Sequence, residues 1–210
     1  MNTAAQGMLF VATDVAPAEE ADFNQWYDRE HVEERVAIEG FLSGTRYQAL
    51  DATRKYLGLY KTRTLATFRS AAYHAAFTRQ TQWSVTHLNN MVNPMRRVCA
   101  IEGRVGIGTG SHLSILTCHT PLSSEEARHL GERMLRENGF ITSSLLLPDA
   151  ELSTPLPKEA AAPRAMNAML LIESREAACG ERLAELACRE INAEAQFYAL
   201  SWQLTHQERT

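Results

Sequence analysis

The strongest constraint on the fold is the order in which strand-like runs and helix signals follow one another. In the first half, a short apolar run at 8–15 precedes a helix that begins at Pro17, runs to about Ile38 and ends at Gly40. Short apolar runs suit buried strands, proline favours the first position of a helix, and glycine favours the position just beyond its end. Two strand-like runs follow, at 41–50 and 55–63. A helical region at 70–91, broken near 79–81, and a last strand at 96–105 complete this half.

The second half follows the same order. Ser123-Ser124-Glu125-Glu126 forms a capping box that opens a helix, and Asn138-Gly139 closes it. A second helix is expected at 177–191, and the strand-like runs span 112–119, 140–147, 167–174 and 195–204. We therefore predict an α+β protein made of two fused ferredoxin-like βαββαβ repeats, at 1–106 and 107–210.

Each repeat would form one antiparallel sheet with its helices on a single face. The bare faces must be covered, and two sheets facing each other would cover both. An α/β barrel with antiparallel sheets is the expected result. The segment 148–164, with four prolines, is expected to be an exposed and poorly ordered insertion.

Composition narrows the range of functions. The net charge of −4 and the pI near 6.0 give no basic footprint, so nucleic acid is not an expected partner. No stretch approaches the ~20 apolar residues of a membrane span, and residues 1–7 lack the basic start of a signal peptide. The four cysteines form no C-x-x-C pair, so we expect free, mostly buried thiols in the cytoplasm. No metal is expected, because no His/Asp/Glu trio has suitable spacing.

The most informative segment for chemistry is the helix at 22–35. On a regular helix Tyr27, Glu30 and His31 fall on its aromatic side, where only apolar residues would normally stand. An imidazole beside a carboxylate and buried aromatics can have a shifted pKa, and histidine is the usual proton shuttle near neutral pH. Arg35 follows one turn later and could hold an anionic group. The candidate catalytic residues are His31, Glu30, Tyr27 and Arg35.

Candidate substrate-binding residues come from the same helix and from aromatic positions elsewhere; they are Trp26, Asn24, Tyr47, Tyr60 and Trp83. An aromatic pocket over the sheet is one interpretation, and ordinary core packing is the other. Glu30 could equally be a solvated residue on the helix edge, and His31 a hydrogen-bonded structural histidine.

The run F-N-Q-W-Y-D-R-E-H-V-E-E-R-V-A-I-E-G-F at 23–41 resembles the W-Y-x-x-E-H signature of bacterial proteins in the dimeric α/β-barrel (EthD-like) superfamily. The similarity continues at Arg46-Tyr47 and at 56–60, and covers about the first 100 residues. Two prolines of the signature are replaced here, by Glu33 and Glu39. The resemblance implies cofactor-free monooxygenases, isomerases, lyases or haem-dependent enzymes, with ligands held between the sheet and its helices.

We therefore expect a small-molecule enzyme without a tightly bound organic cofactor, of the isomerase, lyase or cofactor-independent monooxygenase type. In this hypothesis His31 acts as acid or base, Glu30 orients it, and Arg35 or Tyr27 holds a substrate oxygen. A haem-binding protein and a non-catalytic binding module remain as alternatives. Two chains could also pair as a homodimer through exposed sheet edges.

Overall fold

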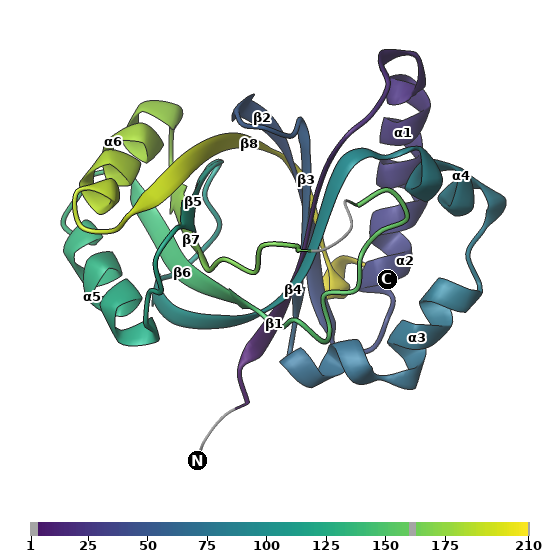
Figure 1. Cartoon of the computed structure of the whole chain (residues 1–210), viewed down its shortest axis with the longest axis horizontal. Helices are drawn as coiled ribbons and strands as arrows, with labels where there is room; N and C mark the ends of the chain where they lie inside the picture. The colour runs from purple at the N-terminus through teal and green to yellow at the C-terminus, as the bar shows by residue number, and fades with distance from the viewer. Residues whose placement is uncertain (1–3, 160–162, 210) are drawn as a thin grey trace.

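The computed structural model describes residues 4–159 and 163–209, and shows a closed barrel with helices on two opposite sides (Figure 1). Neighbouring strands follow the order β1-β3-β2-β8-β5-β7-β6-β4, and β4 pairs with β1 to close the ring. Every pairing is antiparallel. The strands are β1 (Gln6–Asp14), β2 (Phe41–Asp51), β3 (Tyr56–Thr62), β4 (Val92–Gly106), β5 (His112–Cys118), β6 (Phe140–Pro148), β7 (Met169–Ser174) and β8 (Ala193–Thr205).

The two halves of the chain have equivalent topologies. The first contributes β4-β1-β3-β2 and the second β8-β5-β7-β6, and the β2–β8 and β4–β6 pairs join them. The predicted fold class, an α+β barrel of ferredoxin-like βαββαβ units, is confirmed. The division of the chain at 106/107 stays a prediction; β4 ends at Gly106 and β5 begins at His112.

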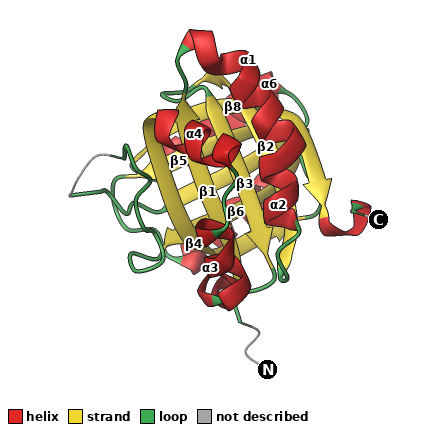
Figure 2. Cartoon of the chain, turned by 90° about the vertical axis from the view of Figure 1, so that its right-hand side faces the viewer, coloured by secondary structure: helices red, strands yellow, loops and turns green. Residues whose placement is uncertain are grey.

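Side-chain alternation along the strands divides the apolar residues into three clusters. In β1, Met8 and Phe10 point into the barrel, whereas Leu9 and Val11 point outward toward the helices of the first half. This follows from the two-residue period of a strand. Figure 2 views those helices from outside, lying across the strands. The helices α5 (Ser124–Met134) and α6 (Ala177–Cys188) cover the other side of the barrel, over a third cluster rich in leucine and alanine.

The first helix is not the single regular helix that the sequence predicts. A short 3₁₀ turn (Pro17–Glu19) leads into α1 (Glu20–Trp26), then a π turn (Tyr27–His31), then α2 (Val32–Val36). In the π turn the Val32 amide bonds the carbonyl of Tyr27, five residues back. Residues five apart therefore share a face there, and the face that the following residues present is rotated.

The second helical region is broken as predicted. It consists of α3 (Ala71–Thr78) and α4 (Gln82–Asn90). Ser70 and Thr81 accept hydrogen bonds from the amides of Tyr73 and Ser84, and so cap the two helices. The predicted capping box at Ser123 is also present.

The proline-rich segment is exposed at several positions, including Thr154 and Pro155, as we predicted, but it is not the poorly ordered insertion that we expected. Residues 149–159, called the strap below, have no helix or strand, but they lie along β4. The strap's Ser153 is fully buried and its hydroxyl accepts the amide of Val98, while the Asp149 amide bonds the Val98 carbonyl. Glu159 pairs with Arg97 where both side chains are buried. Long-range contacts with β4, which are invisible in the local sequence, order the strap; the rest of the predicted insertion includes 160–162, outside the described residues.

Three of the four cysteines are buried, Cys188 is exposed, and all four are free thiols, as expected. No described helix combines the length and apolar character needed to cross a membrane.

Candidate functional site

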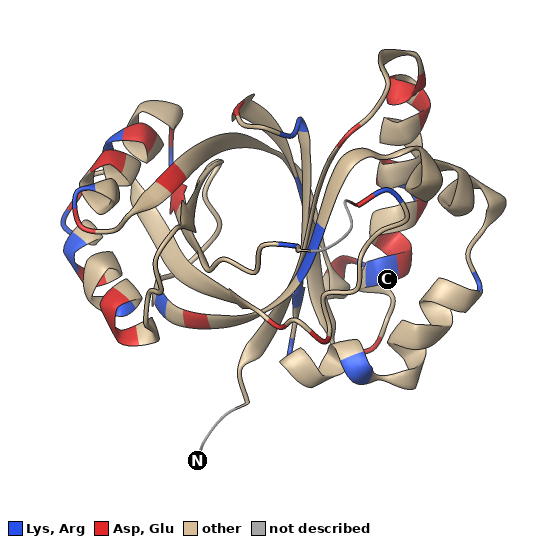
Figure 3. Ribbon diagram, in the orientation of Figure 1, with Lys and Arg blue, Asp and Glu red and all other residues tan. Residues whose placement is uncertain are grey.

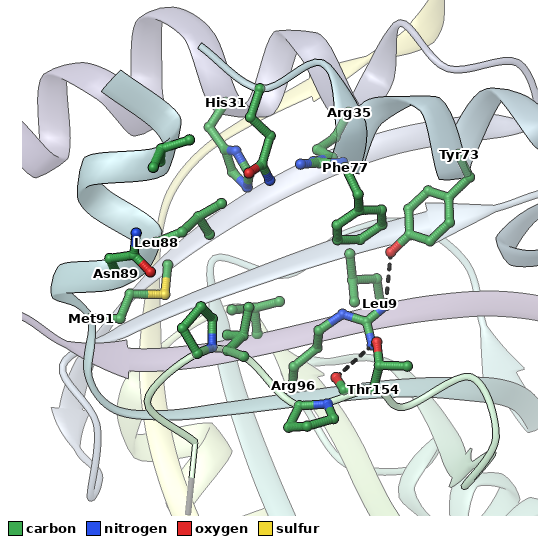
Figure 4. Close-up of a pocket in the computed structure, with 16 residues that line it drawn as sticks. Leu9, His31, Arg35, Tyr73, Phe77, Leu88, Asn89, Met91, Arg96 and Thr154 are labelled. Carbon is green, nitrogen blue, oxygen red and sulfur yellow. Dashed lines mark hydrogen bonds between the residues drawn. The ribbon is translucent and has the colours of Figure 1, made fainter. Parts of the chain in front are cut away.

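A cavity of about 240 Å³ lies on the outer face of the first half, between β1 and β4, the helices and the strap. Its ceiling carries His31 and Arg35, Leu9 lies below them, and Arg96 and Thr154 stand on the opposite wall (Figure 4). Val11 also lines the cavity. The cavity therefore lies between the sheet and its helices, where the resemblance described above implies a ligand.

His31 owes its position to the π turn. Its ring packs against the indole of Trp26, five residues earlier, with ring centroids 4.4 Å apart and an interplanar angle of 34°. The side chain is only 6% exposed, and its Nδ1 atom has no hydrogen-bond partner among the described residues. A structural histidine normally satisfies its ring nitrogens within the protein. In His31 the Nδ1 atom is instead buried and unpaired, and the residue lines the cavity.

The protonation state of His31 follows from its surroundings. Burial, and then the positive charges of Arg35 and Arg46, hold the pKa of the imidazole well below its usual value of 6.5. All of these effects disfavour the imidazolium form. At neutral pH the ring is therefore uncharged, and one of its nitrogens carries a free lone pair.

Arg35 enters the cavity one helical turn after His31 (Figure 4). Its side chain is buried and its Nη1 atom lacks a hydrogen-bond partner among the described residues. The guanidinium carbon lies 5.1 Å from the centroid of the Phe77 ring. Arg35 thus brings a positive charge to the same space as the neutral imidazole.

Sequence reasoning missed the opposite wall of the cavity. Arg96 donates hydrogen bonds to the Tyr73 hydroxyl at 2.9 Å and to the backbone carbonyls of Leu152 and Thr154 in the strap. Phe77 stands between this guanidinium, at 5.9 Å, and that of Arg35. The signal that could have revealed Arg96 is the Arg96-Arg97 pair directly before the apolar run at 98–101.

Glu30 does not lie where the regular helix placed it. Its Oε1 atom accepts hydrogen bonds from Thr81 at 2.5 Å and Ser84 at 3.0 Å, at the start of α4. The Ser84 hydroxyl also accepts the indole N–H of Trp26. Glu30 therefore supports the indole that packs on His31, and it is not among the residues lining the cavity.

Tyr27 and Tyr60 form a buried aromatic layer beneath the imidazole. Their ring centroids lie 5.1 Å and 6.1 Å from that of His31, and neither lines the cavity. Burial raises the pKa of both phenols, so they stay protonated. The guanidinium of Arg46 lies 4.3 Å from the centroid of the Tyr27 ring and pairs with Asp28.

The remaining candidates lie outside the cavity. Trp26 is fully buried core, Asn24 bonds Tyr56 and Arg46, and the Trp83 indole donates to Asp22. Tyr47 lies inside the barrel, on the opposite face of the sheet. A single aromatic pocket formed by Tyr47, Tyr60 and Trp83 is therefore wrong, because strand alternation puts Tyr47 and Tyr60 on opposite faces.

No cluster of three or more histidine, cysteine, aspartate or glutamate side chains suited to a metal ion occurs in the described part of the chain.

No protein-family model matches the chain, and no curated protein matches its sequence. Solved structures do share the fold. An anthrone oxidase-like protein is 11% identical, with coverage of 100% of this chain and 96% of the other, at a TM-score of 0.62. A protein from Fusobacterium nucleatum described as a candidate monooxygenase is 11% identical, with coverage of 98% of this chain and 96% of the other, at a TM-score of 0.56. A heme-binding protein from Thermus thermophilus is 11% identical, with coverage of 97% of this chain and 93% of the other, at a TM-score of 0.51. At these identities the likeness establishes the barrel fold alone.

Proposed function

We propose that this protein is a small-molecule enzyme in which neutral His31 acts as a general base in the cavity under α2. The observation that carries the proposal is a largely buried imidazole that lines the cavity and has an unpaired Nδ1. Buried polar atoms are normally paired, and unpaired ones mark strained or functional positions. Perturbed titratable groups in clefts are typical of active sites.

The chemistry that fits best is proton abstraction beside a carbonyl. The neutral imidazole of His31 takes a proton from the carbon with the lone pair of the ring nitrogen that faces the ligand, and the electron pair of the C–H bond moves toward the carbonyl oxygen as an enolate. Arg35 then stabilises the negative charge that develops on that oxygen. Return of the proton at a different carbon completes an isomerisation, and loss of a leaving group completes an elimination.

The supporting residues have distinct roles in this proposal. Trp26 fixes the plane of the imidazole, and Glu30 acts indirectly, through Ser84 and Trp26. Tyr27 packs beneath the ring. We further propose that the chain belongs with the W-Y-x-x-E-H proteins, since Trp26, Tyr27 and His31 of that signature form one stacked group.

A cofactor-independent monooxygenase is the second candidate, favoured by the fold of the Fusobacterium protein and by the same base. Abstraction of the proton of a phenol by His31 would yield a phenolate, the electron-rich form that reacts with molecular oxygen.

Haem is the group that the Thermus thermophilus heme-binding protein suggests for this fold. A neutral imidazole is a suitable axial ligand for iron. The volume of about 240 Å³, however, is below the ~300–1,000 Å³ typical of pockets for drug-sized ligands, and a haem macrocycle is larger than most of these. The residues present do not fit the group, and no step of the proposal uses it.

Solvent exchange tests the proposal while the substrate is still unidentified. A panel of small ketones, keto acids and lactones is incubated with the protein in D₂O, and loss of C–H signals is followed by NMR. The expected result is enzyme-dependent exchange that falls by about 10²–10⁴-fold in His31→Gln. His74→Gln, an exposed position on α3, is the matched control and should exchange like the wild type. Exchange that is equally fast in His31→Gln would remove His31 from the mechanism.

A further inference from the structure

Four arginine side chains are buried in the part of the chain that the structure describes, and they differ in what surrounds their charges. Figure 3 shows that basic residues occur in the strand layer as well as on the helices. Arg46 pairs with Asp28, Arg97 pairs with Glu159, and Arg96 donates to oxygens of Tyr73 and the strap. Only Arg35 makes no side-chain hydrogen bond or ion pair with any residue in the described ranges. A buried charge is normally paired, because transfer of an unpaired ion from water into the protein costs roughly several kcal/mol.

The immediate surroundings of Arg35 do not compensate its charge. The Phe77 ring contacts the guanidinium and leaves the Nη1 atom without a partner. Glu34 is adjacent in sequence, and Arg35 lowers the pKa of its carboxyl, yet the two form no ion pair. Burial and the charge of Glu30 outweigh that effect, so the pKa of Glu34 is raised from its usual value.

The cavity as a whole is positively charged. It holds Arg35 and Arg96, and none of the described residues lining it is acidic. His31 adds no charge, since its imidazole stays neutral. Much of the rest of the wall is apolar and includes Leu9, Val11, Leu88, Met91 and Leu156. A complementary ligand therefore has one anionic end and an apolar body.

We propose that the ligand of this cavity is a small organic acid, whose carboxylate pairs with Arg35 and whose apolar body lies on Leu9, Val11 and Met91. This inference rests on the proposed function in assigning the substrate to the same cavity. Arginine suits the task because its planar N–H donors can bind both oxygens of a carboxylate. Arg96, already held by Tyr73 and the strap, adds positive potential and keeps the strap's Thr154 at the cavity wall.

Matched acid and amide probes test the charge requirement. Benzoate, phenylacetate and hexanoate are each compared with the corresponding neutral amide by isothermal titration calorimetry at pH 7.5. Within a pair the shape is nearly constant and the charge differs by one. We expect at least one acid to bind with a Kd in the millimolar range or tighter, and at least tenfold more tightly than its amide. No discrimination in any pair, or no acid binding, would overturn the inference.

Variants of Arg35 test whether its guanidinium is the positive charge that binds the acid. Arg35→Gln should weaken acid binding at least tenfold and leave amide binding unchanged. Arg35→Lys keeps the charge without the two-pronged geometry, so it should retain the preference for acids with reduced affinity. Arg69→Gln is the control, because Arg69 is exposed and pairs with the strap's Glu151 outside the cavity. Acid binding that survives in Arg35→Gln, with a wild-type circular dichroism spectrum, contradicts the proposal.

His31→Gln separates this inference from the proposed function. It should still bind the acids, and it should lose deuterium exchange. His31-dependent exchange of neutral carbonyl compounds without acid binding would leave the enzyme proposal standing and end this one. Acid binding through Arg35 without any His31-dependent exchange would leave this inference standing and end the enzyme proposal.

Discussion

The imidazole of His31 lies against the indole of Trp26, with centroids 4.4 Å apart, because a π turn brings residues five apart onto one face of the helix. The indole is itself held by its N–H bond to Ser84. The orientation of the proposed base is therefore set by packing between α1, the π turn and α4. Such pre-organisation is what a positioned base requires.

The first prediction concerns the acid limb of the rate profile. Since the pKa of His31 lies well below 6.5, the imidazole is already in its neutral, basic form at pH 6.5. A plot of kcat/KM against pH should be flat through 6.5 and fall only at lower pH, because kcat/KM reports the free enzyme. An inflection at or above pH 6.5 that disappears in His31→Gln would contradict the neutral, buried imidazole.

The second prediction concerns stability. In the unfolded chain His31 takes up a proton as the pH falls through about 6.5, while in the folded protein it resists protonation to lower pH. Between these two pKa values the unfolded state binds more protons, so stability falls as the pH falls. The slope from this residue is at most about 1.4 kcal/mol per pH unit.

Urea unfolding at pH 7.5 and pH 5 measures that contribution. Wild-type protein should lose more stability over this interval than His31→Gln. Equal losses in the two proteins would show that His31 is not the group responsible.

The third prediction tests the packing beneath the imidazole. A side chain at Gly58 would overlap the Tyr27 hydroxyl, and its Cβ would lie 3.3 Å from the Cζ atom of that ring. Gly58→Ala should therefore cost about 1–3 kcal/mol, as overpacked cores do. Tyr27→Phe removes the hydroxyl and should recover part of the loss in the double mutant. Strictly additive effects would contradict the contact.

The fourth prediction concerns the strap. Glu159→Gln breaks a buried pair with Arg97, so the free energy of unfolding should fall by about 3 kcal/mol. The strap's Glu151 is exposed and pairs with Arg69 at the surface, so Glu151→Gln should change stability by less than about 0.5 kcal/mol. Urea denaturation gives both values, and similar losses in the two variants would argue against a buried anchor.

The fifth prediction concerns haem. Because the cavity is too small for the macrocycle, titration with haemin should give no Soret band beyond that of free haemin, in wild type and in His31→Gln alike. A new band that requires His31 would show that the cavity opens and would restore the haem alternative.

The sequence predicts the fold well because strand alternation and helix caps are local signals. The break before Thr81 and the capping box at Ser123 are examples. The π turn could not be predicted, since a change from four to five residues per hydrogen bond leaves no side-chain pattern. That one change explains why His31 faces the cavity and Glu30 does not.

The rest of the site depends on contacts distant in sequence. Arg96 reaches Thr154, 58 residues away, and the strap is ordered by such contacts. Tyr47 failed as a pocket residue for another reason. Which face a strand residue occupies is fixed by register, and a displacement of one residue exchanges the faces.

Closure of the barrel within a single chain has a genetic consequence. In a barrel built from two identical halves, every substitution occurs twice. A polar residue that destabilises one half therefore also destabilises the other. Here β2–β8 and β4–β6 join halves with different sequences, and each half can vary alone. The α5–α6 side keeps a leucine- and alanine-rich interior, while the opposite side carries an uncompensated arginine and an unpaired imidazole. Stability and chemistry are thereby open to separate selection in one molecule.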